Sequence, residues 1–303
     1  MAYYASMKSH HMLASLAGIV AILFRQTNIV WVGFCCVTAI LNNLRWIGVV
    51  KKEDPLYLQI YNTIIGCLTS FTRTLSIAFP YIMVLIGFIC FMVLNDGIVV
   101  GDRSSHEASL NFPQLLYFCV FTCIFACFMV PNYINIVSTI KMIWKFLTSI
   151  LNLVSVLVLT ATMFLAVHYF TYQHLYLISD NRHFTFYIWR KVFGYHADVK
   201  YFLVPVYLVA MLVMIKELTY KRSAIWILVF FACTSIVLIP QKLLEFRYFI
   251  VPYLLFRLNL RASSWLQLFI EGLVYTAVNL STMWIFLRRT HTQNGLSGQR
   301  IMW

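Results

Sequence analysis

Residues 75–94, LSIAFPYIMVLIGFICFMVL, form a run of twenty residues without a charged side chain. An α-helix rises about 1.5 Å per residue, so a helix of this length crosses the roughly 30 Å hydrocarbon core of a bilayer. The run therefore predicts a membrane-spanning helix.

The composition of the whole chain agrees with that prediction. Of the 303 residues, 61% are hydrophobic and only 11% are charged, whereas an ordinary soluble domain has about 25% charged residues. A soluble core of this size cannot bury so much apolar surface and still present a polar exterior. A soluble enzyme, a nucleic-acid-binding domain and a disordered chain are therefore excluded. No nucleic-acid partner is expected, and membrane lipid is.

Other apolar runs indicate that the chain crosses the membrane several times. Further spans are predicted over residues 112–130, 147–168, 201–215, 223–239 and 265–287. Two shorter runs, 12–24 and 27–41, predict either a hairpin of short helices or one long span with a polar break. No linker rich in Pro, Gly or Ser divides the chain, so we predict an all-α polytopic membrane protein with a single domain over 1–303.

The net charge of +13 bears on orientation. The connectors between the apolar runs alternate between two sets. One set has thirteen Lys and Arg residues and consists of the N-terminal stub, 42–74, 131–146, 216–222 and the tail. The other set, which comprises Arg25, 95–111, 169–200 and 240–264, has ten. The small excess of Lys and Arg in the first set favours placing its connectors on the cytoplasmic side of the membrane.

The second set holds four polar motifs, which points to a functional site on one membrane face. The motifs are FRQTN at 24–28, GDRSSHE at 101–107, DNRHFTFYIWR at 180–190 and LEFRYFIVPY at 244–253. Solvated loops without a shared function would scatter such residues on both sides. A transporter or channel is less favoured, because the polar residues gather at one face rather than along a pore.

The residue types in these motifs suit a phosphate and a sugar. Arginine binds phosphate with two parallel hydrogen bonds and stays charged, and the phosphate candidates are Arg25, Arg103, Arg182 and Arg247. Acids, His and amides suit proton transfer and sugar hydroxyls, and these candidates are Asp102, His106, Asp180, Asn181, His183, Glu245 and Tyr248. The alternatives are an Arg that reaches the headgroups at a span end, self-paired loops and an interfacial aromatic belt.

The cysteines predict no metal site. Cys119, Cys123 and Cys127 recur every four residues and share a helix face, but they lie in an apolar run. Small apolar packing is the favoured interpretation.

Five strings, read in order, carry a resemblance to a known family. They are FRQTNIVW, GIVVGDRSSHEASLNFPQLLYF, LISDNRHFTFYIWRKVF, IPQKLLEFRYFIVPYLLFRLN and the terminal QRIMW. Over about residues 3–303 the chain resembles the dolichyl-phosphate-glucose-dependent α-1,2-glucosyltransferases, which add the last glucose to the lipid-linked oligosaccharide in the endoplasmic reticulum.

The resemblance implies a C-type glycosyltransferase fold, with about 7–9 membrane segments in this chain and the polar motif loops in the lumen. It implies dolichyl phosphate glucose as donor, the diglucosylated dolichyl-diphosphate oligosaccharide as acceptor, and neither a cofactor nor a metal. The donor link is β and the product is α, so the reaction inverts configuration and needs a base on the acceptor hydroxyl.

Family members are longer at the N-terminus, and this chain resembles the C-terminal two thirds of the family domain. The resemblance places the base in an acidic pair of a first lumenal loop, which matches no residue of this sequence. In this chain acting alone, Asp102 or Asp180 would have to serve. The alternative function is an inactive membrane paralogue or a regulatory subunit.

Overall fold

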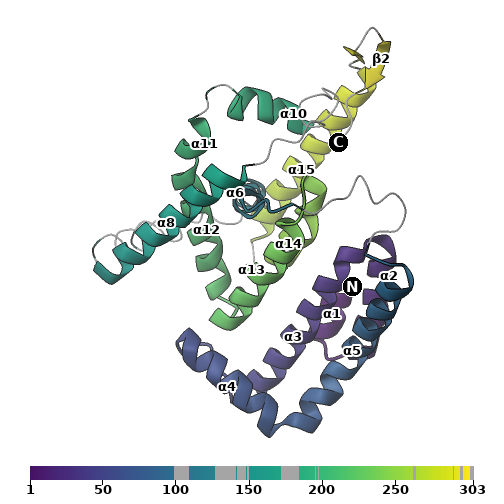
Figure 1. The fold of residues 1–303 in the computed structure, drawn as a ribbon, viewed down its shortest axis with the longest axis vertical. Coiled ribbons are helices and arrows are strands. Elements are labelled where there is room, and N and C mark those ends of the chain that lie inside the picture. Colours follow the sequence, from purple (N-terminus) through teal and green to yellow (C-terminus); the bar gives the residue numbers. More distant parts are fainter. Residues whose placement is uncertain are drawn as a thin grey trace. The chain divides into compact units, whose positions relative to one another are not determined.

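The structure of the protein is a computed structural model, and the elements that it describes are helices apart from one short β-hairpin (Figure 1). It describes residues 1–98, 109–126, 141, 148, 150–171, 184–194, 196, 198–261, 264–288, 290–293 and 296–300.

The helical membrane class expected from the sequence is confirmed. Among the residues that the structure describes, five helices are long and apolar enough to cross a bilayer: Gln26–Trp46, Phe71–Leu94, Asn152–Phe170, Val199–Thr219 and Trp265–Arg288. The described residues also contain three shorter apolar helices: His11–Phe24, which precedes the first long helix, and Pro113–Phe125 and Ala224–Leu238, which lie between later ones. The exposed surface of these helices is rich in Leu, Ile, Val and Phe, as a lipid-facing surface must be.

The chain divides into two compact units. Unit 1 contains Met1–Ala108 and Lys221–Val237, and unit 2 contains Ser109–Tyr220 and Leu238–Trp303. A segment that is distant in sequence thus completes each unit.

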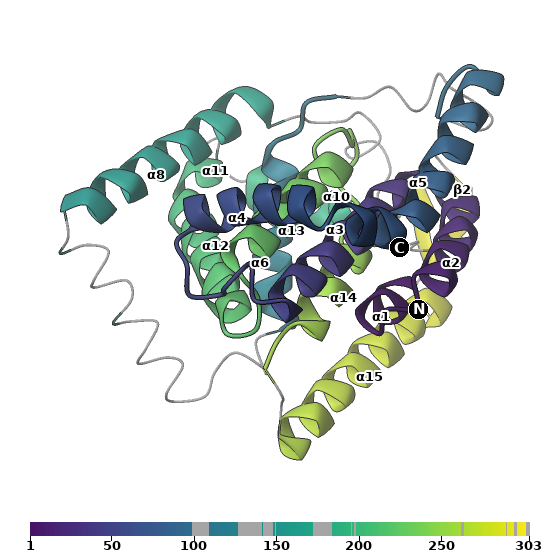
Figure 2. The same ribbon diagram turned by 90° about the horizontal axis from the view of Figure 1, so that it is seen from below.

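Unit 1 is built on a helical hairpin that packs against a long spanning helix. Its elements are α1 (Ala2–Met7), α2 (His11–Phe24), the 3₁₀ turn η1 (Gln26–Asn28), α3 (Ile29–Trp46), α4 (Leu56–Thr69), α5 (Phe71–Leu94) and nearly all of α13 (Ala224–Leu238). Figure 2 shows α1, α2 and α5 gathered near the N-terminus. Of the two sequence alternatives for this stretch, the hairpin is the one observed, since Gly18 of α2 packs against Val32 of α3. Its second helix is longer than expected, because Gln26–Trp46 is long enough to cross a bilayer.

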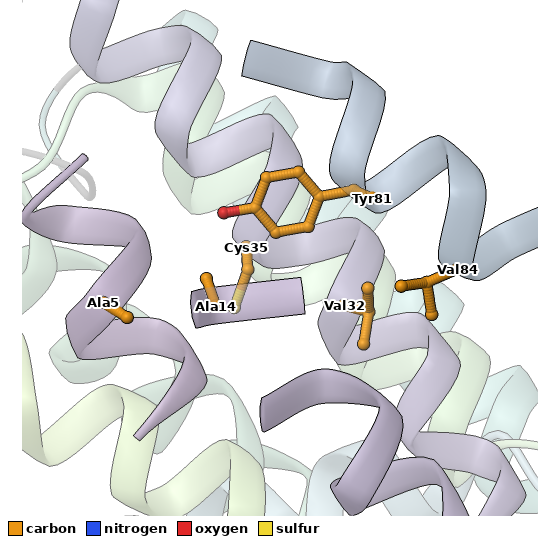
Figure 3. Packing of buried hydrophobic residues seen from close by; sticks show 6 residues of the cluster. All are labelled: Ala5, Ala14, Val32, Cys35, Tyr81 and Val84. Carbon is orange, nitrogen blue, oxygen red and sulfur yellow. The ribbon is translucent and has the colours of Figure 1, made fainter. Parts of the chain in front are cut away.

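The core of the hairpin is tightly packed. In Figure 3, Tyr81 and Val84 of α5 point toward Cys35 and Val32 of α3. Gly18 of α2 makes the close approach possible, because a Cβ atom built there would lie only 2.7 Å from Val32 Cγ2. A small residue at a helix crossing lets the two backbones approach.

An aromatic cluster joins α13 to the rest of unit 1. The rings of Trp226 and Phe230 are stacked with centroids 5.7 Å apart, and Phe34 meets both edge-on. The buried Gln59 side chain accepts a hydrogen bond of 3.0 Å from the backbone N–H of Ile225. It thereby satisfies one of the N–H groups that the first turn of a helix leaves without a partner.

Unit 1 has two chemically different ends. Arg25 lies at the turn between α2 and α3, whereas Arg222 lies at the opposite end of α3 and donates a 2.8 Å hydrogen bond to the Tyr3 hydroxyl. Asn42, near the end of α3, donates to Met7 Sδ at 3.0 Å. Within this unit, the N-terminal stub, the end of α3 and Arg222 therefore lie at one end.

Unit 2 surrounds a short buried helix, α6 (Pro113–Phe125). Its other elements are α8 (Ile150–Phe170), α10 (Phe184–Ile188), the π turn η3 (Trp189–Phe193), α11 (Val199–Phe202), α12 (Val204–Thr219), the 3₁₀ turn η4 (Phe246–Tyr248), α14 (Ile250–Leu258), α15 (Trp265–Arg288), β1 (Thr290–Gln293) and β2 (Leu296–Arg300). The two strands pair antiparallel.

Helices α6, α12 and α14 run in the same direction. The Asn111 N–H, before α6, donates to the Ile239 carbonyl at 2.9 Å, so the starts of α6 and of the 240–248 segment lie together. Further along, Cys123 Sγ donates to the Ala210 carbonyl of α12 at 3.5 Å. The last turn of α12 then meets the residues after α14, where Arg261 contacts Glu217.

Residues 240–264 extend along unit 2 from one of its ends to the other. Helix α14 carries the chain from the end that holds Glu245 to the end that holds Glu217. Helix α15 returns antiparallel to α14, because Glu271 pairs with Arg257 and Tyr275 with Tyr253. In Figure 1, α15 accordingly ends on the side of unit 2 where α10 lies.

The crossing of α2 and α3 gives a stability prediction. We expect Gly18→Ala to destabilise the protein by about 1–3 kcal/mol, the usual cost of overpacking, because the stiff Val32 side chain cannot move aside easily. Thermal unfolding of the purified chain in detergent measures the change. Gly33→Ala is the matched control, since a Cβ at Gly33 of α3 meets no atom within 4 Å. Equal melting temperatures for the wild type and Gly18→Ala would contradict the close crossing.

Candidate functional site

The structure describes four of the eleven residues that the sequence proposes for the site. Arg25 lies in unit 1, and Glu245, Arg247 and Tyr248 lie together in unit 2. The other seven, Asp102, Arg103, His106, Asp180, Asn181, Arg182 and His183, lie outside the described residues.

Arg25 lies at a break between two membrane helices that specific hydrogen bonds stabilise. Its backbone is extended, with φ −159° and ψ 120°, so α2 stops there before η1 begins. The Asn28 side chain donates a 2.7 Å hydrogen bond to the Ala21 carbonyl, and the Asn28 N–H donates to the Arg25 carbonyl at 2.9 Å. These bonds satisfy carbonyls at the end of α2, which explains how polar backbone is tolerated at this position.

An apolar groove leads to this break along α2 and α5. It has a volume of about 630 Å³, and its wall is formed by side chains that include Met12, Leu16, Ile19 and Leu23 of α2 with Phe79, Met83, Phe88 and Phe91 of α5. Gln26, the neighbour of Arg25, lines the same groove. The groove thus combines an apolar length with polar groups at one end.

The second described cluster is an ion pair on η4. Arg247 pairs with the Glu245 carboxylate, and its guanidinium lies 5.5 Å from the centre of the Tyr248 ring. Burial alone would lower the pKa of Arg247, but the carboxylate and the Tyr248 side chain outweigh it and raise that pKa. The Arg247 side chain is 65% exposed, so its charge remains accessible to an anion.

The start of α6 holds this cluster in place. The Gln114 amide donates to the Leu243 carbonyl at 3.0 Å, and Phe121 packs against Phe246 with ring centres 5.3 Å apart. Both Asn111 and Gln114 are fully buried, and the amide oxygen of each has no hydrogen-bond partner among the described residues. Sequence analysis missed these two amides, although their three-residue spacing at the start of an apolar helix places them on one face.

Sequence analysis also missed two ion pairs at the opposite end of unit 2. Arg257 binds Glu271 with two hydrogen bonds of 2.8 Å, and Tyr275 donates to the same carboxylate at 3.0 Å. Arg261 contacts Glu217 at 3.4 Å. Charges within an apolar bundle are tolerated when they are paired, so these residues support the packing of α12, α14 and α15.

The described residues thus offer cations and hydrogen bonds rather than metal chemistry. Among them, no three His, Cys, Asp or Glu side chains gather closely enough to bind a metal ion. Arg25 and Arg247 are suited to a phosphate group, because a guanidinium matches phosphate oxygens and cannot lose its charge.

The bidentate pair of Arg257 and Glu271 predicts that the ion pairs at the two ends of unit 2 contribute differently to stability. Arg257→Met leaves the Glu271 carboxylate, whose side chain is only 10% exposed, without its cation. We expect a loss of about 3 kcal/mol, the low end for a broken buried pair, and recovery of most of it in Arg257→Met/Glu271→Leu. Chemical unfolding in detergent measures both changes.

Glu245→Gln is the matched control for that prediction, because the Glu245–Arg247 pair is more exposed. We expect it to change stability by less than about 1 kcal/mol. A similar loss in both single variants, or no recovery in the double variant, would contradict the structural role of the Arg257 pair.

Comparison with known proteins identifies the family. The model of the DIE2/ALG10 family matches residues 1–258. A mouse protein is 39% identical over the whole chain, a human protein 41% identical over the whole chain, and a Drosophila melanogaster protein 34% identical over 97% of it. All three are named Dol-P-Glc:Glc(2)Man(9)GlcNAc(2)-PP-Dol alpha-1,2-glucosyltransferase.

The chain spans 66% of the length of each of these relatives. No solved structure matches the chain. The family match covers most of the sequence and includes the Arg25 turn and the 245–248 cluster. The chain therefore belongs to the DIE2/ALG10 family.

Proposed function

We propose that this protein transfers glucose from dolichyl phosphate glucose, in α-1,2 linkage, to a diglucosylated dolichyl-diphosphate oligosaccharide. The names of its relatives in the DIE2/ALG10 family support this activity. We place the protein in the endoplasmic reticulum membrane as a multi-pass protein with its polar motif loops in the lumen. Dolichyl phosphate glucose, the lipid-linked oligosaccharide and membrane lipid are its proposed partners.

One observation in the structure carries the proposal. The wall of the groove between α2 and α5 is mostly apolar and includes Gln26, the residue that follows Arg25 at the turn. Dolichyl phosphate glucose has the complementary shape, with a long isoprenoid chain joined to a phosphate. An apolar wall takes the chain and Arg25 takes the phosphate.

The proposed chemistry is a single displacement at the anomeric carbon. The acceptor 2-hydroxyl attacks C1 of the donor glucose while the bond from C1 to the phosphate oxygen breaks. The hydroxyl proton passes to a base, and dolichyl phosphate leaves with the bonding electrons. Arg25 and Arg247, with Arg103 and Arg182, are the proposed cations that stabilise the leaving phosphate. No residue is assigned as the base. The proposed sugar contacts are Asp102, His106, Asp180, Asn181, His183, Glu245 and Tyr248.

We further propose a C-type glycosyltransferase fold in which residues 1–303 form one membrane domain. The five long apolar helices and three shorter ones support a total of about 7–9 membrane segments. This domain would correspond to the C-terminal two thirds of the family domain, in keeping with the share of the relatives that the chain covers.

The role of Arg25 predicts a specific loss of activity. We expect Arg25→Gln to lower glucose transfer about 100-fold, the usual cost of removing one group that stabilises developing charge. The chain is reconstituted in vesicles with synthetic donor and acceptor, and the oligosaccharide product is measured by mass spectrometry. Lys51→Gln, at an exposed cation of unit 1 outside the groove, is expected to keep wild-type activity.

The outcomes of this experiment are distinguishable. Arg25→Lys retains the positive charge but loses the two parallel donors of the guanidinium, so its rate should lie between those of wild type and Arg25→Gln. A wild-type rate for Arg25→Gln would overturn the assignment of Arg25. An unmodified chain that folds and transfers no glucose would overturn the proposed activity.

The groove makes a second prediction, about the lipid tail. Leu16→Trp should fill part of the groove, and we expect at least a tenfold higher KM for a dolichyl-length donor. The KM for a farnesyl-length donor should change less, because a short chain occupies less of the groove. Leu13→Trp is the control, since Leu13 is an exposed residue of the same helix that does not line the groove. Equal KM changes for both donors would argue against the groove as the chain-binding site.

A further inference from the structure

A second cavity of unit 1 lies at the end opposite to Arg25. It has a volume of about 520 Å³ and is enclosed by the ends of α1, α2, α3 and α5. Its polar lining residues are Ser6, Ser9, His11, Asn42, Asn43 and Arg73. Neither the proposed transfer reaction nor the family resemblance uses this cavity.

The cavity is lined by hydrogen-bond donors and a cation, with no Asp or Glu among its lining residues. Three of the polar groups already have partners: Ser6 Oγ donates to the Cys35 carbonyl, Asn42 Nδ2 contacts Met7 Sδ, and His11 Nδ1 lies 3.3 Å from the Tyr81 hydroxyl.

Asn43 differs from these residues. Its Nδ2 atom is buried and has no hydrogen-bond partner among the described residues. A buried donor without a partner costs free energy unless a ligand or water satisfies it. Arg73 adds a permanent positive charge on the same wall. An anion with several acceptor oxygens is complementary to both the Asn43 donor and the Arg73 charge.

The surroundings of the cavity are also positive. Arg222 lies at this end of unit 1, where burial, and then the charge of Arg45, lower its pKa. The acids Glu53 and Asp54 of unit 1 lie in the loop before α4 and do not line the cavity. Asp54 is engaged there, because its carbonyl accepts a 2.7 Å hydrogen bond from Gln59 and its carboxylate contacts Asn62 at 3.5 Å.

The position of the cavity matches the depth of lipid headgroups. It lies where the spanning helix that ends at Trp46 stops and where the span that begins at Phe71 starts. Trp46 lines the cavity and is 85% exposed. Tryptophan gathers at membrane–water interfaces, and basic residues near them attract anionic headgroups.

We propose that this cavity binds a phosphate group, supplied by an anionic phospholipid of the leaflet that contacts this end of unit 1. In the proposed complex the Arg73 guanidinium donates to the phosphate oxygens. The Asn43 side chain turns its amide, which is buried in this structure, toward the same oxygens. The site is independent of glucose transfer, because it lies at the opposite end of the unit from the Arg25 turn. Free inorganic phosphate carries the same chemistry, so the experiment separates the two sources.

The test titrates the full chain in detergent with phosphatidic acid and reads the bound lipid by native mass spectrometry. We expect Arg73→Gln to weaken binding about tenfold, the loss for one charge-assisted hydrogen bond. Asn43→Leu should weaken it about fivefold, and Arg73→Lys should restore most of the affinity. Lys51→Gln is the control, because it removes an exposed cation of unit 1 that does not line the cavity.

Competition identifies the source of the phosphate. Phosphatidic acid that inorganic phosphate at 10 mM does not displace supports the lipid source. Displacement by inorganic phosphate together with loss of binding in Arg73→Gln retains the phosphate site and overturns the lipid assignment. Unchanged binding in both Arg73→Gln and Asn43→Leu overturns the site itself. So does an equal loss in Lys51→Gln, which would show that only net charge matters.

The melting temperature of each of the four variants shows whether that variant folds, so a loss of binding through unfolding can be recognised. Arg73 is exposed at the start of α5, so its substitution should leave the fold intact. Folded Arg73→Gln and Asn43→Leu variants that both bind phosphatidic acid like the wild type then refute the site.

Discussion

Hydrocarbon offers no hydrogen-bonding partner to a peptide group, so each membrane segment of this chain must satisfy its backbone within itself. That constraint explains the long helices of both units. It also explains where the helices stop, because polar backbone needs a substitute partner at each end. The Asn28 side chain supplies one after α2, and Gln59 supplies another at the start of α13. The side-chain amides of Asn28 and Gln59 therefore help to define where α2 ends and where α13 begins.

Charge in the same apolar surroundings must be paired or must reach an end of the bundle. Unit 2 shows the first solution, with Arg257 and Arg261 held by Glu271 and Glu217. Unit 1 shows the second solution, because Arg25 and Arg222 lie at opposite ends of α3. The proposed function uses one end of unit 1, and the proposed phosphate cavity uses the other. The two sites differ in chemistry, since one joins an apolar groove and the other a cavity lined with donors.

Membership of the DIE2/ALG10 family and the geometry of unit 1 support each other. A donor that carries a phosphate on an isoprenoid chain needs a protein surface with both polarities, arranged along one direction. The α2–α5 groove has that arrangement because α2 ends at Arg25 while α5 continues beside it. The polar break is therefore a feature of the proposed site as well as an interruption of the helix.

The sequence by itself determined the membrane class, most of the spanning helices and the family, because apolar length and long ordered motifs are local properties of the chain. It also predicted the break at Arg25, since charge within an apolar run is a local signal. Only the tertiary structure decided that α14 runs beside α6 and that Arg257 and Arg261 lie away from Arg247. It alone revealed the buried amides of Asn111 and Gln114 and the cavity around Asn43. These features depend on contacts between residues far apart in sequence, which hydropathy and spacing do not encode.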